Sequence, residues 1–116
     1  MRRSTVLLVD PDPEARVALR SALEAAGLDP LPVGSEADAR LVARYLRTPL
    51  DLVLVDARVG GVHGADLARA LLEQRPEARA LVVGGPEPEP GWAWIDKPFT
   101  SRELVSAVEA VLTGPR

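Results

Sequence analysis

The chain has 116 residues, 47% of them hydrophobic, and a formal net charge of −3. A chain of this length can bury well over half of the surface that it exposes when unfolded, so we expect one domain over residues 1–116. Thirteen dispersed arginines form no basic stripe, which argues against nucleic acid as a partner. No apolar segment is long enough for a signal peptide or a membrane span, so we expect a cytoplasmic protein without a membrane partner.

The first predicted elements are a buried strand and an amphipathic helix. Thr5–Val9 is a continuous apolar run that ends at Asp10, which favours a strand covered on both faces. Asp12 followed by Pro13 is typical of a helix N-cap with proline at the first helical position. The helix should continue to about Ala26, because Gly27 follows as a C-terminal cap.

A short strand and a second helix come next. Pro32 within Leu31–Val33 cannot donate to a ladder, so this strand should lie at a sheet edge. Ser35 is predicted to cap a helix that stops before Pro49. We expect this helix to turn four large side chains inward: Leu41, Val42, Tyr45 and Leu46.

The central segment places one carboxylate at the end of a buried strand. Leu52–Asp56 is apolar up to Asp56 and is followed by a glycine-rich turn over Arg58–Gly64. A helix is predicted over Ala65–Arg75, and a fourth strand over Ala80–Val83 that ends at a glycine pair. Strands that alternate with helices in this way predict a parallel sheet.

The C-terminal third interrupts this alternation with a proline-rich segment. Proline occupies every second position from Pro86 to Pro90, which excludes a helix and favours polyproline II. Trp94-Ile95 is predicted to form a fifth strand. Thr100 and Glu103 form a capping box that opens a last helix, with Gly114 just beyond its end.

Five such strands predict a doubly wound α/β sheet in the order 2-1-3-4-5, whose ligands bind at the carboxyl ends of the strands. Asp10, Asp56 and Lys97 should meet there. Clustered carboxylates attract a cation, because two like charges about 4 Å apart repel by roughly 4 kcal/mol at an effective dielectric constant near 20. Lys97 is the only lysine in the chain, and it stands where a compact point charge is useful.

These residues resemble the receiver domain of two-component response regulators over essentially the whole chain. The similar motifs are Val9–Pro13, Asp51–Gly64 and Lys97–Phe99. The resemblance implies a flavodoxin-like fold without enzymatic activity and, over these residues, without an output domain. Asp56 would accept a phosphoryl group from a histidine kinase or phosphotransfer protein, and Lys97 would pair with that group.

The resemblance also implies a Mg²⁺ site and a conformational switch, and the chain departs from the family at both. Magnesium would be held by Asp10, Asp56 and the backbone carbonyl of Arg58, but Pro11 replaces the second acid that the family carries after the first strand. Gly84 replaces the switch hydroxyl, and the proline segment replaces the fourth helix. We therefore expect weak or absent Mg²⁺ binding and an impaired switch in a degenerate member of the family.

Two tryptophans lie at the start of the predicted fifth strand, Trp92 just before it and Trp94 as its first residue. Trp92 and Trp94 would either pack over the gap left by the missing helix or form an exposed patch that binds another signalling protein. Trp94 occupies the aromatic switch position of the family. We also consider a homodimer, in which a second copy of the chain is the partner.

Three classes of function follow from these patterns. The first is an atypical receiver that is phosphorylated at Asp56. The second is a pseudo-receiver that works independently of phosphate as an interaction or dimerisation module. The third, more remote, is a phosphatase that uses Asp10 within the Asp-x-Asp sequence of residues 10–12.

Overall fold

A computed structural model describes residues 2–115, so the two end residues of the predicted domain lie outside the described range. Helices and strands follow one another in this order: β1 Thr5–Val9, α1 Pro13–Ala25, β2 Asp29–Val33, α2 Glu36–Tyr45, β3 Leu52–Asp56, β4 Arg58–Val59, β5 Val62–His63, α3 Gly64–Gln74, β6 Arg79–Val83, β7 Trp94–Ile95 and α4 Ser101–Thr113.

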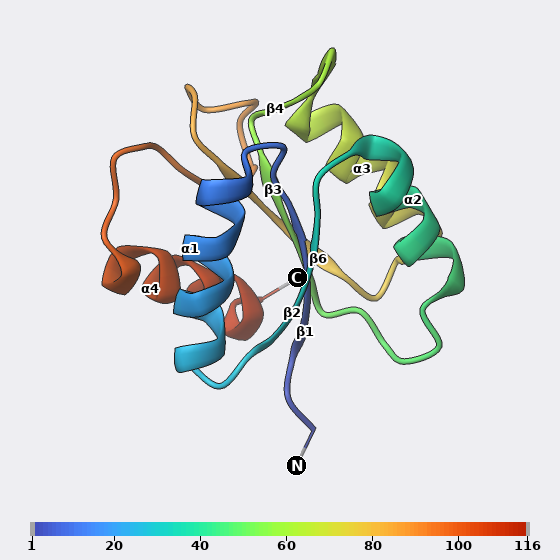
Figure 1. The fold of residues 1–116 in the computed structure, drawn as a ribbon, viewed down its shortest axis with the longest axis horizontal. Coiled ribbons are helices and arrows are strands. Elements are labelled where there is room, and N and C mark those ends of the chain that lie inside the picture. Colours follow the sequence, from blue (N-terminus) through green and yellow to red (C-terminus); the bar gives the residue numbers. More distant parts are fainter. Residues whose placement is uncertain (1, 116) are drawn as a thin grey trace.

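The main sheet has five parallel strands in the order β2-β1-β3-β6-β7. Helices α1 and α4 cover one face, and α2 and α3 cover the other (Figure 1). The predicted doubly wound, flavodoxin-like fold is therefore confirmed. The predicted edge position of the strand that contains Pro32 is also confirmed, because β2 is an outer strand.

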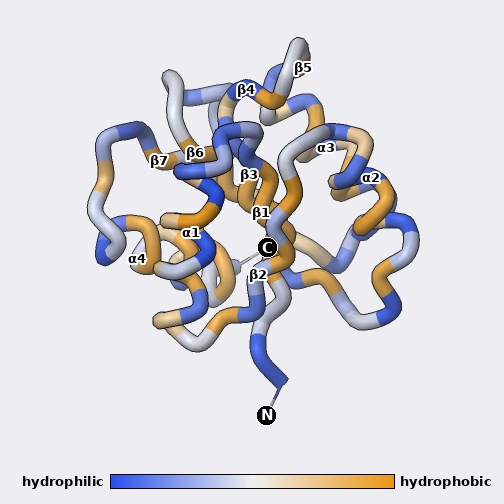
Figure 2. Tube along the Cα trace, viewed as in Figure 1, coloured by the Kyte–Doolittle hydropathy of each residue, from blue (hydrophilic) through white to orange (hydrophobic). Residues whose placement is uncertain are grey.

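The core forms two apolar layers, one on each side of the sheet. All five residues of β1 are buried, as are the first four residues of β3. These strands need no polar face because helices cover both sides, which explains why their sequences are continuous apolar runs. Figure 2 shows the same pattern, with apolar strands at the centre and polar stretches at the periphery.

Helix α1 begins and ends as its sequence predicts. The side chain of Asp12 accepts a hydrogen bond of 3.1 Å from the amide of Glu14, which satisfies one of the free donors of the first turn. Leu19 and Leu23 are buried against the sheet. Gly27 follows the helix with φ +84, a conformation that glycine adopts without strain.

Helix α2 is rotated relative to the sequence prediction. Its buried residues are Ala39 and Ala43, whereas Leu41 is 54% exposed and Tyr45 is 65% exposed. The prediction that Leu41 and Tyr45 point inward was wrong, although Val42 and Leu46 do pack partly against the core. Small alanines let the helix lie close to the sheet, and this packing outweighs the burial of the larger side chains.

The glycine-rich turn after Asp56 contains more structure than predicted. Strands β4 and β5 form a two-residue antiparallel hairpin around Gly60, which has φ +62. Gly64 follows so closely that a Cβ there would lie 2.0 Å from the carbonyl oxygen of Asp56. Only glycine permits this approach, which brings the start of α3 against the end of β3.

No helix occurs in residues 84–93, all of which the structure describes, so the predicted absence of a helix there is confirmed. Residues 86–91, which we call the proline segment, are followed by β7, which has only two residues. Arg69 of α3 holds Glu89 of the segment in an ion pair of 3.1 Å and lies over the ring of Trp92, 5.5 Å from its centre. The segment is thus fixed to α3 by side chains.

The last helix carries the predicted capping box. Thr100 accepts from the amide of Glu103, and Glu103 accepts from the amide of Thr100. Arg79 donates to two carbonyl oxygens at the far end of α4. Within residues 2–115, no helix is long and apolar enough to cross a membrane.

Candidate functional site at the carboxyl edge of the sheet

The strand register brings the predicted site residues to one edge of the sheet. Val9 pairs with Val55, so Asp10 follows β1 beside Asp56 at the end of β3. Asp56 pairs with Val83 of β6, and Gly84 comes next in the chain. The carboxylates and the glycine therefore lie together at the carboxyl edge of the sheet, as the sequence predicts.

Asp56 is held from two directions at the end of β3. Lys97 Nζ donates to Asp56 Oδ1 at 2.9 Å, and the backbone amide of Arg58 donates to Asp56 Oδ2 at 3.1 Å. The Asp56 side chain is 17% exposed, whereas that of Lys97 is 46% exposed. Both oxygens are oriented, and the carboxylate remains open to a small reactant.

Asp10 is the most deeply buried charged residue among those described, at 2% exposure. Its Oδ1 accepts from the amide of Asp12 at 2.9 Å, but its Oδ2 is buried without a hydrogen-bond partner. Burial raises the pKa of Asp10, against the hydrogen bond from Asp12, and the negative charge of Asp56 raises it further. Asp10 therefore has one buried carboxylate oxygen that accepts no hydrogen bond.

The ammonium of Lys97 remains charged at neutral pH. Partial burial lowers its pKa, but the hydrogen bond and negative charge of Asp56 outweigh this effect, and the net shift is upward. The charges of Asp10 and Asp12 act in the same direction. Lys97 thus provides a fixed positive charge beside Asp56.

Gly84 lies at the position where the resemblance implies a hydroxyl. Its φ is +89, and its amide donates to the carbonyl of Ile95 at 2.8 Å. A Cβ on this residue would lie 3.8 Å from Asp56 Oδ1. The glycine therefore lies beside the Asp56 carboxylate, but it offers no side-chain donor to a bound group.

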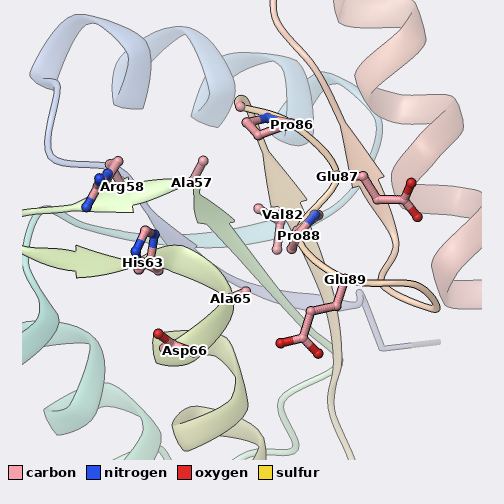
Figure 3. Close-up of a pocket in the computed structure, with 11 residues that line it drawn as sticks. Ala57, Arg58, His63, Ala65, Asp66, Val82, Pro86, Glu87, Pro88 and Glu89 are labelled. Carbon is pink, nitrogen blue, oxygen red and sulfur yellow. The ribbon is translucent and has the colours of Figure 1, made fainter.

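A cavity of about 540 Å³ adjoins the site (Figure 3). It lies between the β4–β5 hairpin, the start of α3 and the proline segment. Arg58 and His63 lie on the hairpin side, and the Glu87 side chain points away from them. Ala57 and Gly85, which directly follow Asp56 and Gly84, form part of the lining, but the side chains of Asp10, Asp56 and Lys97 do not.

The two tryptophans have different environments. Trp92 is half-buried and packs against the core beneath α3. Trp94 is 37% exposed, and its Nε1 donates to the carbonyl of Gly85 at 2.8 Å. One residue therefore covers the sheet and the other reaches solvent. A binding role for either remains a prediction.

Two arginines support the site without having been predicted to do so. Arg16 of α1 donates to the backbone carbonyl of Asp10 at 2.8 Å, and it packs so closely on Gly34 that a Cβ there would be 2.6 Å away. Arg69 fixes the proline segment. Neither residue stands out in the sequence, because arginines on helices are common and no local pattern reveals that Arg16 reaches the Asp10 carbonyl or that Arg69 reaches Glu89.

Comparisons with known proteins identify relatives of this chain. No family model matches the chain. The C4-dicarboxylate transport transcriptional regulatory protein DctD of Pseudomonas aeruginosa is 32% identical over 120 residues, which are 95% of this chain and 25% of that protein. The phosphate regulon transcriptional regulatory protein PhoB of the same organism is 33% identical over 130 residues, 96% of this chain and 53% of that protein. The chain thus spans between a quarter and about half of the length of these relatives.

Solved structures extend the likeness to the whole fold. A response regulator receiver protein from Sinorhizobium medicae has a TM-score of 0.85 at 26% identity, with 97% of each chain covered. The chemotaxis protein CheY4 of Vibrio cholerae has a TM-score of 0.84 at 21% identity, covering 96% of this chain and all of that one, and supports the fold alone. The chain is a receiver domain and belongs to the family of two-component response regulators.

Proposed function

We propose that the chain accepts a phosphoryl group on Asp56 in two-component signalling, with weakened Mg²⁺ binding and an impaired switch. The observation that carries the proposal is the 2.9 Å contact between Lys97 Nζ and Asp56 Oδ1 at the mouth of the sheet. A carboxylate nucleophile needs its own charge and that of the phosphoryl oxygens offset, and the ammonium supplies part of that charge.

The transfer requires little of the protein beyond position and charge. A carboxylate oxygen of Asp56 forms a bond to phosphorus while the bond from phosphorus to the donor breaks, and the donor keeps the electron pair. The donor is a phosphohistidine of a histidine kinase or phosphotransfer protein. Lys97 stays protonated throughout and neutralises charge on the phosphoryl oxygens, because its pKa lies above the ordinary value.

The residues present fit a magnesium ion in part. Asp10 Oδ2 is a buried oxygen without a hydrogen-bond partner, as a metal ligand would be before binding. Asp10, Asp56 and the Arg58 carbonyl would hold the ion, which when bound supplies further positive charge to the phosphoryl oxygens. Pro11 offers no carboxylate, Asp12 caps α1, and within residues 2–115 no three acidic or histidine side chains cluster closely enough to form a metal site.

A phosphorylation-independent receiver is the second candidate. Gly84 provides no hydroxyl to draw toward a phosphoryl group, and the proline segment stands in place of a movable helix. The phosphatase alternative has less support, because Asp10 is almost fully buried and Asp12 is engaged as a helix cap.

Intact-mass analysis after treatment with acetyl phosphate and Mg²⁺ tests the proposal. We expect one added phosphoryl mass on the wild-type chain and none on Asp56→Asn. Beryllofluoride with Mg²⁺ should shift the amide resonances of residues 56–58 and 84–85 in the wild type. An absence of both the adduct and the shifts would leave the phosphorylation-independent receiver as the function.

A further inference from the structure

Helix α2 exposes large apolar side chains on its outer side, which is unfavourable for a helix whose outer side meets only water. It buries two alanines and leaves Leu41 and Tyr45 mostly exposed. These side chains border an apolar groove against β2 whose floor includes Leu31 and Val33. The helix lies at the rim of the molecule (Figure 1), and Figure 2 shows apolar stretches along it. A contiguous apolar surface of this kind indicates a contact with another protein.

The neighbouring sheet edge cannot supply that contact through strand pairing. The amide of Asp29 donates to Ser4 at 2.9 Å, toward β1, so positions 30 and 32 face the open edge of β2. Both positions are proline, which has no N–H to donate. The outer edge therefore lacks amide donors, and a partner must bind through side chains of α2 and the groove.

The charges around Leu41 match those of a second α2 in antiparallel orientation. Asp38 and Arg44 each lie three residues from Leu41 and flank it on the helix surface. A two-fold axis through Leu41 would place Asp38 of one copy opposite Arg44 of the other, twice. The same axis would place the small Ala37 opposite Tyr45. Residues i and j then exchange places across the axis, as an isologous contact requires.

Both charged groups are available for such pairing. Among the described residues, neither Asp38 nor Arg44 takes part in an ion pair, whereas the neighbouring Glu36 and Arg40 pair with each other at 2.8 Å. The guanidinium of Arg44 lies over the ring of Tyr45, 5.4 Å from its centre, on the exposed side of the helix. The acidic end of α2 is thus complementary to its own basic end.

We propose that a second copy of this chain covers the exposed face of α2, in an antiparallel, two-fold symmetric contact centred on Leu41. The contact involves neither Asp56 nor Lys97, because it lies beside β2, at the sheet edge opposite to β7. A helix of ten residues is about 15 Å long. The contact is therefore smaller than a standard interface, and the dimer should dissociate on dilution.

Sedimentation velocity on the full chain, from about 1 μM to about 1 mM, tests the proposal. We expect a monomer–dimer equilibrium that Leu41→Glu abolishes, because the substitution places two like charges on the axis. Val17→Glu is the matched control: Val17 is 66% exposed on α1, and its replacement should leave the equilibrium unchanged. A wild-type chain that stays monomeric throughout overturns the proposal.

Exchanging the charges of Asp38 and Arg44 tests the antiparallel geometry itself, as distinct from any other contact made by this face. Asp38→Arg and Arg44→Asp should each weaken dimerisation at least tenfold, because symmetry turns two attractive pairs into two repulsive pairs. The double variant Asp38→Arg/Arg44→Asp restores both pairs with reversed signs and should return the dissociation constant to within about threefold of the wild type. If both single variants fold by circular dichroism but the double variant fails to recover, the antiparallel geometry is wrong.

Discussion

The backbone of Gly84 lies directly against the stem of Lys97. A Cβ on Gly84 would lie 3.4 Å from Lys97 Cε and 3.5 Å from Lys97 Cδ, both ordinary van der Waals contacts. The φ of +89 at Gly84 is itself unfavourable for any residue with a side chain. Glycine at this position therefore has a structural role: it adopts the left-handed backbone against which the lysine stem packs on its way to Asp56.

The first prediction concerns Gly84→Ala. We expect a loss of about 1–2 kcal/mol in the free energy of unfolding from the left-handed backbone, measured by urea denaturation. Acetyl phosphate labelling of Asp56 should also slow, because relief of the strain at φ +89 shifts the backbone against which the lysine stem packs. Gly91→Ala is the control, since Gly91 has φ +96 with nothing near its Cβ position. Equal labelling rates in the two variants would contradict the role assigned to Gly84.

The second prediction concerns the charge beside Asp56. Lys97→Arg keeps a positive charge but replaces the compact point charge of the ammonium with a planar, delocalised guanidinium. We expect at least tenfold slower labelling by acetyl phosphate in Lys97→Arg and in Lys97→Ala, measured by intact mass over time. Arg102→Ala, on the exposed first turn of α4, should label at the wild-type rate. Wild-type labelling of Lys97→Ala would show that the ammonium is dispensable.

The third prediction uses the raised pKa of Asp10. The pKa of Asp10 is higher in the folded state than in the unfolded chain, where it is about 3.9. The group therefore contributes stability below its unfolded pKa, and this contribution is lost as the pH rises through the folded pKa. At neutral pH the buried charge therefore destabilises the fold. Asp10→Asn should raise the free energy of unfolding by roughly 1 kcal/mol at pH 7 and leave it nearly unchanged at pH 3.

Magnesium provides the second readout for Asp10. Millimolar Mg²⁺ should raise the melting temperature of the wild type slightly at pH 7, and removal by EDTA should reverse the effect. Asp10→Asn should not respond. Asp12→Asn keeps a good N-cap and should behave like the wild type in both experiments. A Mg²⁺ response that persists in Asp10→Asn would exclude Asp10 as a ligand.

The sequence predicted the scaffold well because its signals are local or strongly periodic. Continuous apolar runs gave β1 and β3, and the Asp12-Pro13 pair and the Thr100–Glu103 box marked two helix starts that the structure confirms. The convergence of Asp10, Asp56 and Lys97 followed from a general property of parallel sheets, in which neighbouring strands end at the same edge.

The features that were missed depend on packing between distant segments. The inward prediction for Leu41 and Tyr45 relied on side-chain size, but α2 packs through Ala39 and Ala43. No local pattern reveals which stripe of a helix approaches a sheet when both stripes contain apolar residues. The contacts of Arg69 with Glu89 and Trp92 span about twenty residues and depend on the path of the proline segment.

The last prediction concerns this connection between α3 and the proline segment. Arg69→Ala removes the ion pair with Glu89 and the cation–π contact with Trp92. The free energy of unfolding should fall by only about 1 kcal/mol, because both contacts lie near the surface. In a Trp94→Phe background Trp92 is the only tryptophan. Its emission should shift to longer wavelength, and acrylamide quenching should increase, as the segment separates from α3.

Arg20→Ala provides the comparison, since Arg20 pairs only with Glu24 of its own helix, at 3.6 Å. That variant should leave the Trp92 emission unchanged. Arg69→Lys keeps the charge but has no planar group to stack on the ring, so it should give an intermediate result. If Arg69→Ala alters neither emission nor quenching, Trp92 is held by the core beneath α3 alone, and the proline segment does not need the arginine for its position.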